Sequence, residues 1–161
     1  MIAAPPRILR EEVPLSPEGR TEVAFLDEIL ARWQSWAREA DGVPPWSRFR
    51  PFEHPRLLPY LMVYERIGDR FRCAIVGDEA TQALPVKLAG CFIDEAMPRE
   101  NLPDITRRFD HALATGHPNY VEKTMAWHPE HGARTYRALQ LPFTGGQGRN
   151  PRILSVMDFG F

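Results

Sequence analysis

The stretch that decides the fold is Leu57–Ala80, which reads "LLPYLMVYERIGDRFRCAIVGDEA". An apolar run at Leu61–Tyr64 is followed by a turn at Ile67–Asp69 and then by a second alternating run. This pattern is typical of a β-hairpin. One face of the second strand is expected to carry Phe71, Cys73 and Ile75. Gly77 ends that strand, and the "DEATQAL" that follows predicts a short helix, so the chain turns there from sheet to helix.

Before the hairpin, the sequence predicts an amphipathic helix at residues 16–41. Ser16-Pro17-Glu18 has the residue types of a helix start, and Asp41-Gly42 those of a stop. At about 100° per residue, one apolar stripe of this helix comprises Leu26, Ile29, Leu30, Trp33 and Trp36. Such a stripe needs a large apolar partner, either the domain's own sheet or a second copy of the helix. We interpret it as a dimer interface, and we expect residues 1–15 to form a flexible arm.

After the hairpin, the sequence predicts short helical pieces, a long helix and three more strands. The long helix starts at Asn101 and ends at Gly116, and its apolar face carries Ile105, Phe109, Ala112 and Leu113. The strands are expected at 119–127, 134–143 and 152–159, as antiparallel neighbours because their joints are turn-rich. This order favours an α+β fold: one five-stranded antiparallel sheet, covered on one face by the intervening helices.

The composition narrows the class of protein. The chain has 161 residues, a formal net charge of −1 and interleaved charges of both signs, which does not favour nucleic acid or a membrane as partner. No apolar stretch has the length of a signal peptide or a membrane span, so the cytoplasm is the expected location. Cys73 and Cys91 lack C-x-x-C spacing, and we expect both to be reduced, buried thiols.

Several segments together resemble a PAS domain, of the bacterial family of small stand-alone PAS proteins. They are "GVPPWSRFRP" at 42–51, "LLPYLMVYE" at 57–65, "RFRCAIVGDEA" at 70–80, "LAGCFIDEAMP" at 88–98 and "LQLPF" at 139–143. The resemblance implies a PAS-like domain at residues 42–161, in which helices close over the sheet from the corner after Gly77. It also implies that the space between helices and sheet can hold a small molecule. The alternative is a solid core.

A ligand pocket of that kind would be lined by the inner face of the sheet, the long helix and a neighbouring phenylalanine. The predicted lining is Val63, Cys73, Ile75, Phe92, Phe109, Leu113 and Leu139. If the fourth strand has the opposite phase, Tyr136 and Gln140 become hydrogen-bonding points instead. This lining suits an aromatic or acyl ligand better than a nucleotide. The alternative is that these residues pack on one another.

The sequence identifies no cofactor. His111 falls near 240° when Ile105 is set to zero at about 100° per residue, roughly opposite the apolar stripe, which argues against haem. Cys91 lacks the neighbours of a flavin-reactive cysteine. The turn "HPEH" at 128–131 has two histidines and a glutamate but no fixed geometry for a metal ion. "GGQGRNP" at 145–151 lacks the Lys-Ser/Thr of a phosphate-binding loop.

No nucleophile, base and orienting acid come together in the sequence, so we do not expect an enzyme. The prediction is a non-catalytic PAS-like sensory or signalling module that binds a small apolar or aromatic ligand or a protein partner. It is expected to form a homodimer and to act through a separate signalling protein. The alternative is a small cone-shaped α+β enzyme or ligand carrier with a buried acid–base residue. The orientation of Glu122 and Asp158 distinguishes the two.

Overall fold

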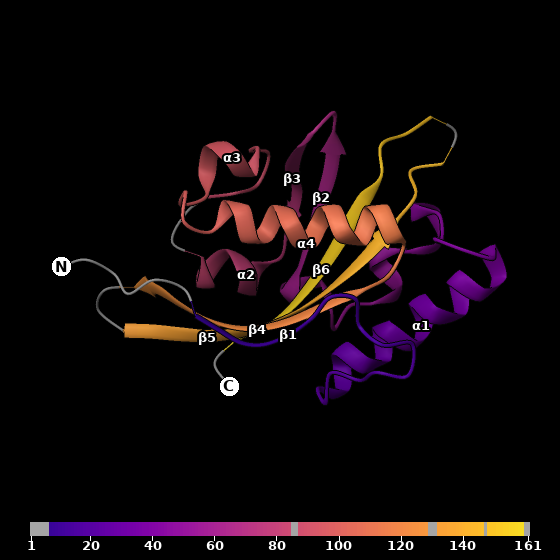
Figure 1. Cartoon of the computed structure of the whole chain (residues 1–161), viewed down its shortest axis with the longest axis horizontal. Helices are drawn as coiled ribbons and strands as arrows, with labels where there is room; N and C mark the ends of the chain where they lie inside the picture. Colours follow the sequence, from indigo (N-terminus) through magenta and orange to yellow (C-terminus); the bar gives the residue numbers. More distant parts are fainter. Residues whose placement is uncertain (1–6, 85–86, 129–131, 147, 160–161) are drawn as a thin grey trace.

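The computed structural model describes residues 7–84, 87–128, 132–146 and 148–159. It is an α+β fold with one antiparallel sheet, in the strand order β1-β4-β5-β6-β2-β3 (Figure 1). The strands are β1 (Arg7–Glu12), β2 (Leu61–Ile67), β3 (Arg70–Val76), β4 (Asn119–His128), β5 (Gly132–Phe143) and β6 (Arg152–Phe159). The helices are α1 (Ala24–Ala40), α2 (Asp78–Ala83), α3 (Ile93–Ala96) and α4 (Leu102–Thr115), with 3-10 turns η1 (Trp46–Arg48), η2 (Pro51–Glu53) and η3 (Leu58–Tyr60). No helix in these ranges is long and apolar enough to cross a membrane.

The predicted order of elements is confirmed, but the predicted number of strands is wrong. The hairpin β2–β3 and the antiparallel run β4–β5–β6 belong to one sheet, and the predicted helices lie between them in the chain. Among the described residues, the sheet has six strands instead of five because β1 adds to its edge.

Strand β1 comes from the segment that was expected to be a flexible arm. It pairs antiparallel with β4, from Arg7 opposite Thr124 to Glu12 opposite Tyr120. The Arg10 guanidinium lies over the Tyr120 ring, 4.9 Å from its centroid. Its sequence, RILREE, does not alternate, so the strand owes its structure to the edge of β4 and not to a pattern of its own.

Both faces of the sheet are covered. Helices α2, α3 and α4 lie on one face, as predicted for the intervening helices, and α1 lies on the other (Figure 1). The α4 face of the sheet carries Met62, Tyr64, Phe71, Cys73, Val121, Tyr136, Ala138, Ile153 and Met157. The α1 face carries Leu61, Val63, Tyr120, Leu139, Leu141, Phe143, Leu154 and Val156. The two clusters therefore share the same strands.

The two long helices differ in how well their starts could be predicted. Helix α4 lies where it was expected, and Gly116 ends it with a positive φ of 74°. Helix α1 begins at Ala24, eight residues after the predicted start at Ser16. Glu22 has a φ of 68°, which is incompatible with a continuous helix, and Ser16 forms a turn in which its carbonyl accepts a 2.8 Å hydrogen bond from Gly19.

A β-bulge in β3 changes which side chains reach the α4 face. Val63 pairs with Ile75, but the next residue, Tyr64, pairs with Cys73, so Ala74 is an extra residue in the strand. The bulge turns Ile75 toward the α1 face, where its side chain is 44% exposed. The prediction that Ile75 shares a face with Phe71 and Cys73 is therefore wrong.

The corner after β3 is closed by backbone atoms. A Cβ atom on Gly77 would lie 2.1 Å from the carbonyl oxygen of Leu58 and 2.5 Å from that of Pro59. The Gly77 N–H donates a 2.8 Å hydrogen bond to the carbonyl of Leu61. Glycine is required here because η3 crosses so close to the turn, and this close contact fixes where α2 begins.

Candidate functional site

A row of polar side chains crosses the α4 face of the sheet. Asn119 on β4 pairs in register with Gln140 on β5, and Gln140 pairs with Ser155 on β6. All three side chains are buried, with at most 4% of their surface exposed. The Asn119 side-chain amide donates a hydrogen bond to the carbonyl of Arg108 on α4. The row therefore lies in the interior between α4 and the sheet.

Two oxygen atoms of this row lack a hydrogen-bond donor. Among the described residues, neither Asn119 Oδ1 nor Gln140 Oε1 has a partner. Most buried polar atoms in folded proteins are hydrogen-bonded to protein or to ordered water, because an unpaired one costs free energy. A hydrogen-bond donor from a bound molecule would therefore stabilise the structure if it paired with these two oxygen atoms.

A charged cluster adjoins the row toward β1. Asp104 on α4 accepts hydrogen bonds from Lys123 Nζ at 2.8 Å, from Arg107 at 2.9 Å and from Arg108. Glu11 on β1 binds the same two arginines, at 2.7 Å and 3.2 Å. Lys123 and Arg108 are almost fully buried, with 2% and 1% of their side chains exposed. The cluster thus ties β1, α4 and β4 together.

The pKa values in this cluster reflect burial and pairing. Burial alone would raise the pKa of Asp104, but the hydrogen bonds from Lys123 and Arg108 outweigh it and hold that pKa well below its ordinary value. Burial lowers the pKa of Lys123, against the attraction of Asp104. The cluster is arranged to keep Asp104 ionised, which suits a structural ion cluster better than a proton-transfer pair.

Aromatic rings line the other end of the same interior. The Tyr64 ring lies 4.7 Å from the Phe109 ring, and Phe71 meets Phe109 edge-on at 5.2 Å. Tyr136 is buried beside them on β5, and burial raises its pKa to about 12. The interior under α4 thus has an apolar aromatic end and a polar end.

The structure brings together only part of the predicted pocket lining. Cys73 and Phe109 are buried in the α4-face cluster, and Leu113 packs against it. Phe92 is half-buried at the edge of β3, where the Arg70 guanidinium lies 3.8 Å from its ring centroid. Cys73, Phe109 and Leu113 thus remain on the side of the sheet where the resemblance implies a ligand.

The other predicted lining residues lie on the opposite side. Val63 and Leu139 belong to the α1-face cluster, and the bulge at Ala74 turns Ile75 to that side as well. The phase of β5 is the alternative one, so Tyr136 and Gln140 face α4 in place of Leu139. The seven predicted residues therefore do not enclose one space.

The stripe of α1 that was predicted as a dimer interface is occupied within the chain. Leu26, Ile29, Leu30 and Trp33 are at most 5% exposed and pack on the α1 face. Trp33 Nε1–H donates a 2.8 Å hydrogen bond to the carbonyl of Pro142 on β5, and the half-buried Trp36 ring lies 6.3 Å from the Phe143 ring. The sheet of the same chain is the partner, so this stripe is not free for a second copy.

Two acids, Glu122 and Asp158, were expected to distinguish a PAS-like module from an enzyme or ligand carrier by their orientation. Neither of them faces α4. Glu122 and Asp158 both pair in register with Arg137, and their carboxylates lie 3.9 Å and 3.7 Å from its guanidinium. Their neighbours Val121 and Met157 face α4, so Glu122 and Asp158 face the other way. Burial raises the pKa of Asp158, against the opposing effect of Arg137.

The residues considered for cofactors are also separated. His111 is half-buried instead of fully solvent-facing. The prediction that Cys91 is buried is wrong, since it is partly exposed, whereas Cys73 is buried and its burial raises the pKa of its thiol to about 12. The centre of the "HPEH" turn, 129–131, lies outside the described residues. Within the described part of the chain, no three His, Cys, Asp or Glu side chains are grouped to hold a metal ion.

Sequence reasoning missed the polar members of this interior. Arg108 lies one position before Phe109 on the apolar side of α4, and a charged residue there reads as a boundary of the stripe. The spacing of Asp104 and Arg108 at i and i+4 was an available signal for an ion pair. Asn119 and Gln140 could have been found only by knowing the register of β4 and β5.

Comparison with known proteins adds no relative. No protein-family profile matches the chain, and no curated protein matches it in sequence.

Proposed function

We propose that the chain is a PAS-like sensory or signalling module that binds a small molecule between α4 and the sheet. The order of elements supports this: a hairpin and three antiparallel strands share one sheet, and the helices between them in the chain cover one face. The resemblance to PAS domains implies the same order. The module acts on a separate signalling protein, and catalysis is not part of the proposal.

The observation that carries the proposal is the pair of unpartnered acceptors on Asn119 and Gln140. They lie in register under α4, in an interior whose other end is aromatic. A ligand that matches this arrangement is mainly apolar or aromatic and carries one or two hydrogen-bond donors, such as a hydroxyl or amine. A buried polar group that is hydrogen-bonded only in the ligand-bound state contributes both affinity and specificity.

The test is the mass of the purified protein, measured by native and then by denaturing mass spectrometry. We expect an excess mass that is lost on denaturation. Gln140→Met keeps the volume of the side chain and removes its acceptor, so it is expected to lose the excess mass. Leu141→Met, on the adjacent position that faces α1, is the matched control and is expected to keep it.

Two results would contradict the proposal. A wild-type protein that shows only its own mass, even after incubation with a library of aromatic alcohols and amines, has no ligand of this class. An excess mass that Gln140→Met retains in full places the ligand elsewhere. In the first case, an interaction module with a filled interior is the better description.

A further inference from the structure

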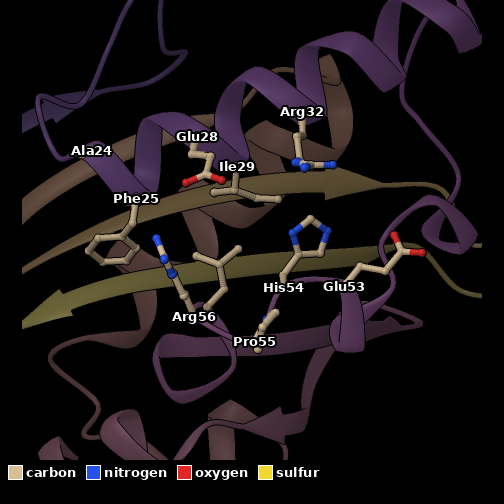
Figure 2. Close-up of a pocket in the computed structure, with 10 residues that line it drawn as sticks. Ala24, Phe25, Glu28, Ile29, Arg32, Glu53, His54, Pro55 and Arg56 are labelled. Carbon is tan, nitrogen blue, oxygen red and sulfur yellow. The ribbon is translucent and has the colours of Figure 1, made fainter.

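A separate pocket lies on the α1 side of the molecule. It has a volume of about 340 Å³ and is formed by residues 24–32 of α1 and by residues 53–57 (Figure 2). The sheet separates it from the polar row under α4. Pockets that bind small molecules commonly begin at about 300 Å³, so this one is large enough for a ligand the size of a single substituted ring.

The floor of the pocket is apolar apart from one histidine. Ile29 and Leu57 are 1% and 6% exposed, and His54, which also lines the pocket, is 8% exposed. The His54 ring stacks on Phe49 at 5.2 Å, with only 8° between the planes. His54 Nε2 has no hydrogen-bond partner among the described residues. The floor thus combines apolar contact with one unsatisfied imidazole.

Burial and the neighbouring Arg32 lower the pKa of His54 and so favour its neutral form. Burial lowers its pKa most, and the nearby Arg32 lowers it further, while Glu53 and Glu28 act in the opposite direction. Figure 2 shows the Arg32 side chain reaching from α1 toward the His54 ring, which comes from the opposite wall. A neutral imidazole beside a guanidinium can donate or accept a hydrogen bond without repelling the cation.

The rim has two guanidinium groups that form no salt bridge with any described residue. Arg32 and Arg56 both line the pocket, and neither joins Glu28, although Glu28 and Arg32 are spaced i and i+4 on α1. Glu53, in contrast, is paired with Arg50 at 3.7 Å.

We propose that this pocket binds a small aromatic or aliphatic carboxylate, with the carboxylate on Arg32 and the apolar part on Ile29 and Leu57. A guanidinium matches a planar carboxylate through two parallel hydrogen bonds. A fully hydrated anion such as phosphate makes no apolar contact with Ile29 and Leu57. The apolar floor therefore favours a ligand with a hydrocarbon part over phosphate.

The test is a titration of the ¹⁵N-labelled protein with phenylacetate, followed by NMR. We expect saturable shifts in the backbone amides of residues 24–32, 53, 54, 56 and 57; residue 55 is a proline and has no N–H. Phenylacetamide has the same ring without the charge and is expected to bind at least about tenfold more weakly. Arg32→Gln is expected to weaken phenylacetate binding at least about fivefold. Arg38→Gln, an exposed position of α1 that does not line the pocket, is the matched control and keeps wild-type affinity.

Three results would overturn the proposal. They are the absence of saturable shifts up to about 20 mM phenylacetate, equal binding of phenylacetamide, and equal shifts of the same amides by inorganic phosphate. Unchanged affinity in Arg32→Gln would also remove the assigned role of that residue. Because Gln140→Met acts on the other face of the sheet, it leaves this titration unchanged, so the outcome is independent of the proposed function.

Discussion

At the scale of single residues, Asp104 is the carboxylate that pairs with the buried cations on the α4 side of the sheet. It accepts hydrogen bonds from Arg107, Arg108 and Lys123, and two of these cations are almost completely buried. A buried cation that loses its partner is costly, because water cannot reach it to replace the lost interaction. The stability of the α4 side should therefore respond strongly to the charge of this one carboxylate.

We expect Asp104→Asn to lower the free energy of unfolding by about 3 kcal/mol at neutral pH. The folded-state pKa of Asp104 lies below its ordinary value of 3.8. The stabilisation is therefore fully present above about pH 4 and is lost as the pH falls below it. Urea denaturation of both proteins between pH 7 and pH 2.5 measures the effect, and the difference between them should shrink toward the acid end.

The matched control is Asp94→Asn. Asp94 is also paired with an arginine, Arg70, at 2.8 Å, but its side chain is 46% exposed. Solvent screens such a pair, so this variant should stay close to the wild type throughout. Equal losses in the two variants, or a difference for Asp104→Asn that does not depend on pH, would contradict the role assigned to the cluster.

At the scale of elements, the bulge in β3 decides which side chains of the hairpin enter the interior. Ile75 should have been buried on the α4 face by simple alternation, and it is 44% exposed on the other side. Val76 takes its place, packed against the α4-face cluster. A change of a single residue in register reverses the face of every following side chain.

A pair of threonine variants tests this register. Threonine keeps the β-branched shape, so strand propensity changes little. Ile75→Thr is expected to lower the free energy of unfolding by less than about 0.7 kcal/mol, as for a surface position, and Val76→Thr by about 1 to 2 kcal/mol, as for a core one. Chemical denaturation of the two variants gives the comparison. A larger loss of unfolding free energy for Ile75→Thr than for Val76→Thr would indicate that Ile75 lies in the interior. That result would contradict the bulge at Ala74.

The same elements show what sequence reasoning can and cannot reach. Helix α4 could be predicted closely because its apolar period and its terminal Gly116 are local signals. The bulge, strand β1 and the phase of β5 depend on pairing with distant segments, and the sequence of RILREE or LQLPF carries no local sign of it. Asn119 and Gln140 were therefore beyond a strand-by-strand interpretation, while Phe109 and Cys73 were within it.

At the scale of the whole molecule, α1 is part of the domain core. Its stripe packs on the face of the sheet opposite α4, and Trp33 is hydrogen-bonded to the backbone of β5. A homodimer stays a prediction, but its interface must use other residues than this stripe. Any signal that passes between the two faces has to cross a single layer of strands.

That single layer leads to an expectation for unfolding. Strands β2, β5 and β6 each contribute alternate side chains to both hydrophobic clusters, so neither cluster can lose its strands without exposing the other. The three described tryptophan side chains, Trp33, Trp36 and Trp46, report on the α1 side, and the buried thiol of Cys73 reports on the α4 side. We expect the two probes to follow one cooperative transition.

The measurement uses a background with Trp127→Phe and Cys91→Ser, so that each probe reports on one face. Tryptophan fluorescence and labelling of the Cys73 thiol are followed against urea concentration. We expect the fluorescence and the labelling to have the same urea midpoint. In that case Cys73 becomes accessible only when the whole protein unfolds. If the thiol reacts at a lower urea concentration than the fluorescence changes, α4 opens while the α1 side stays folded. The helical cover would then be a separate unit, and entry of a ligand under α4 would need no more than that local opening.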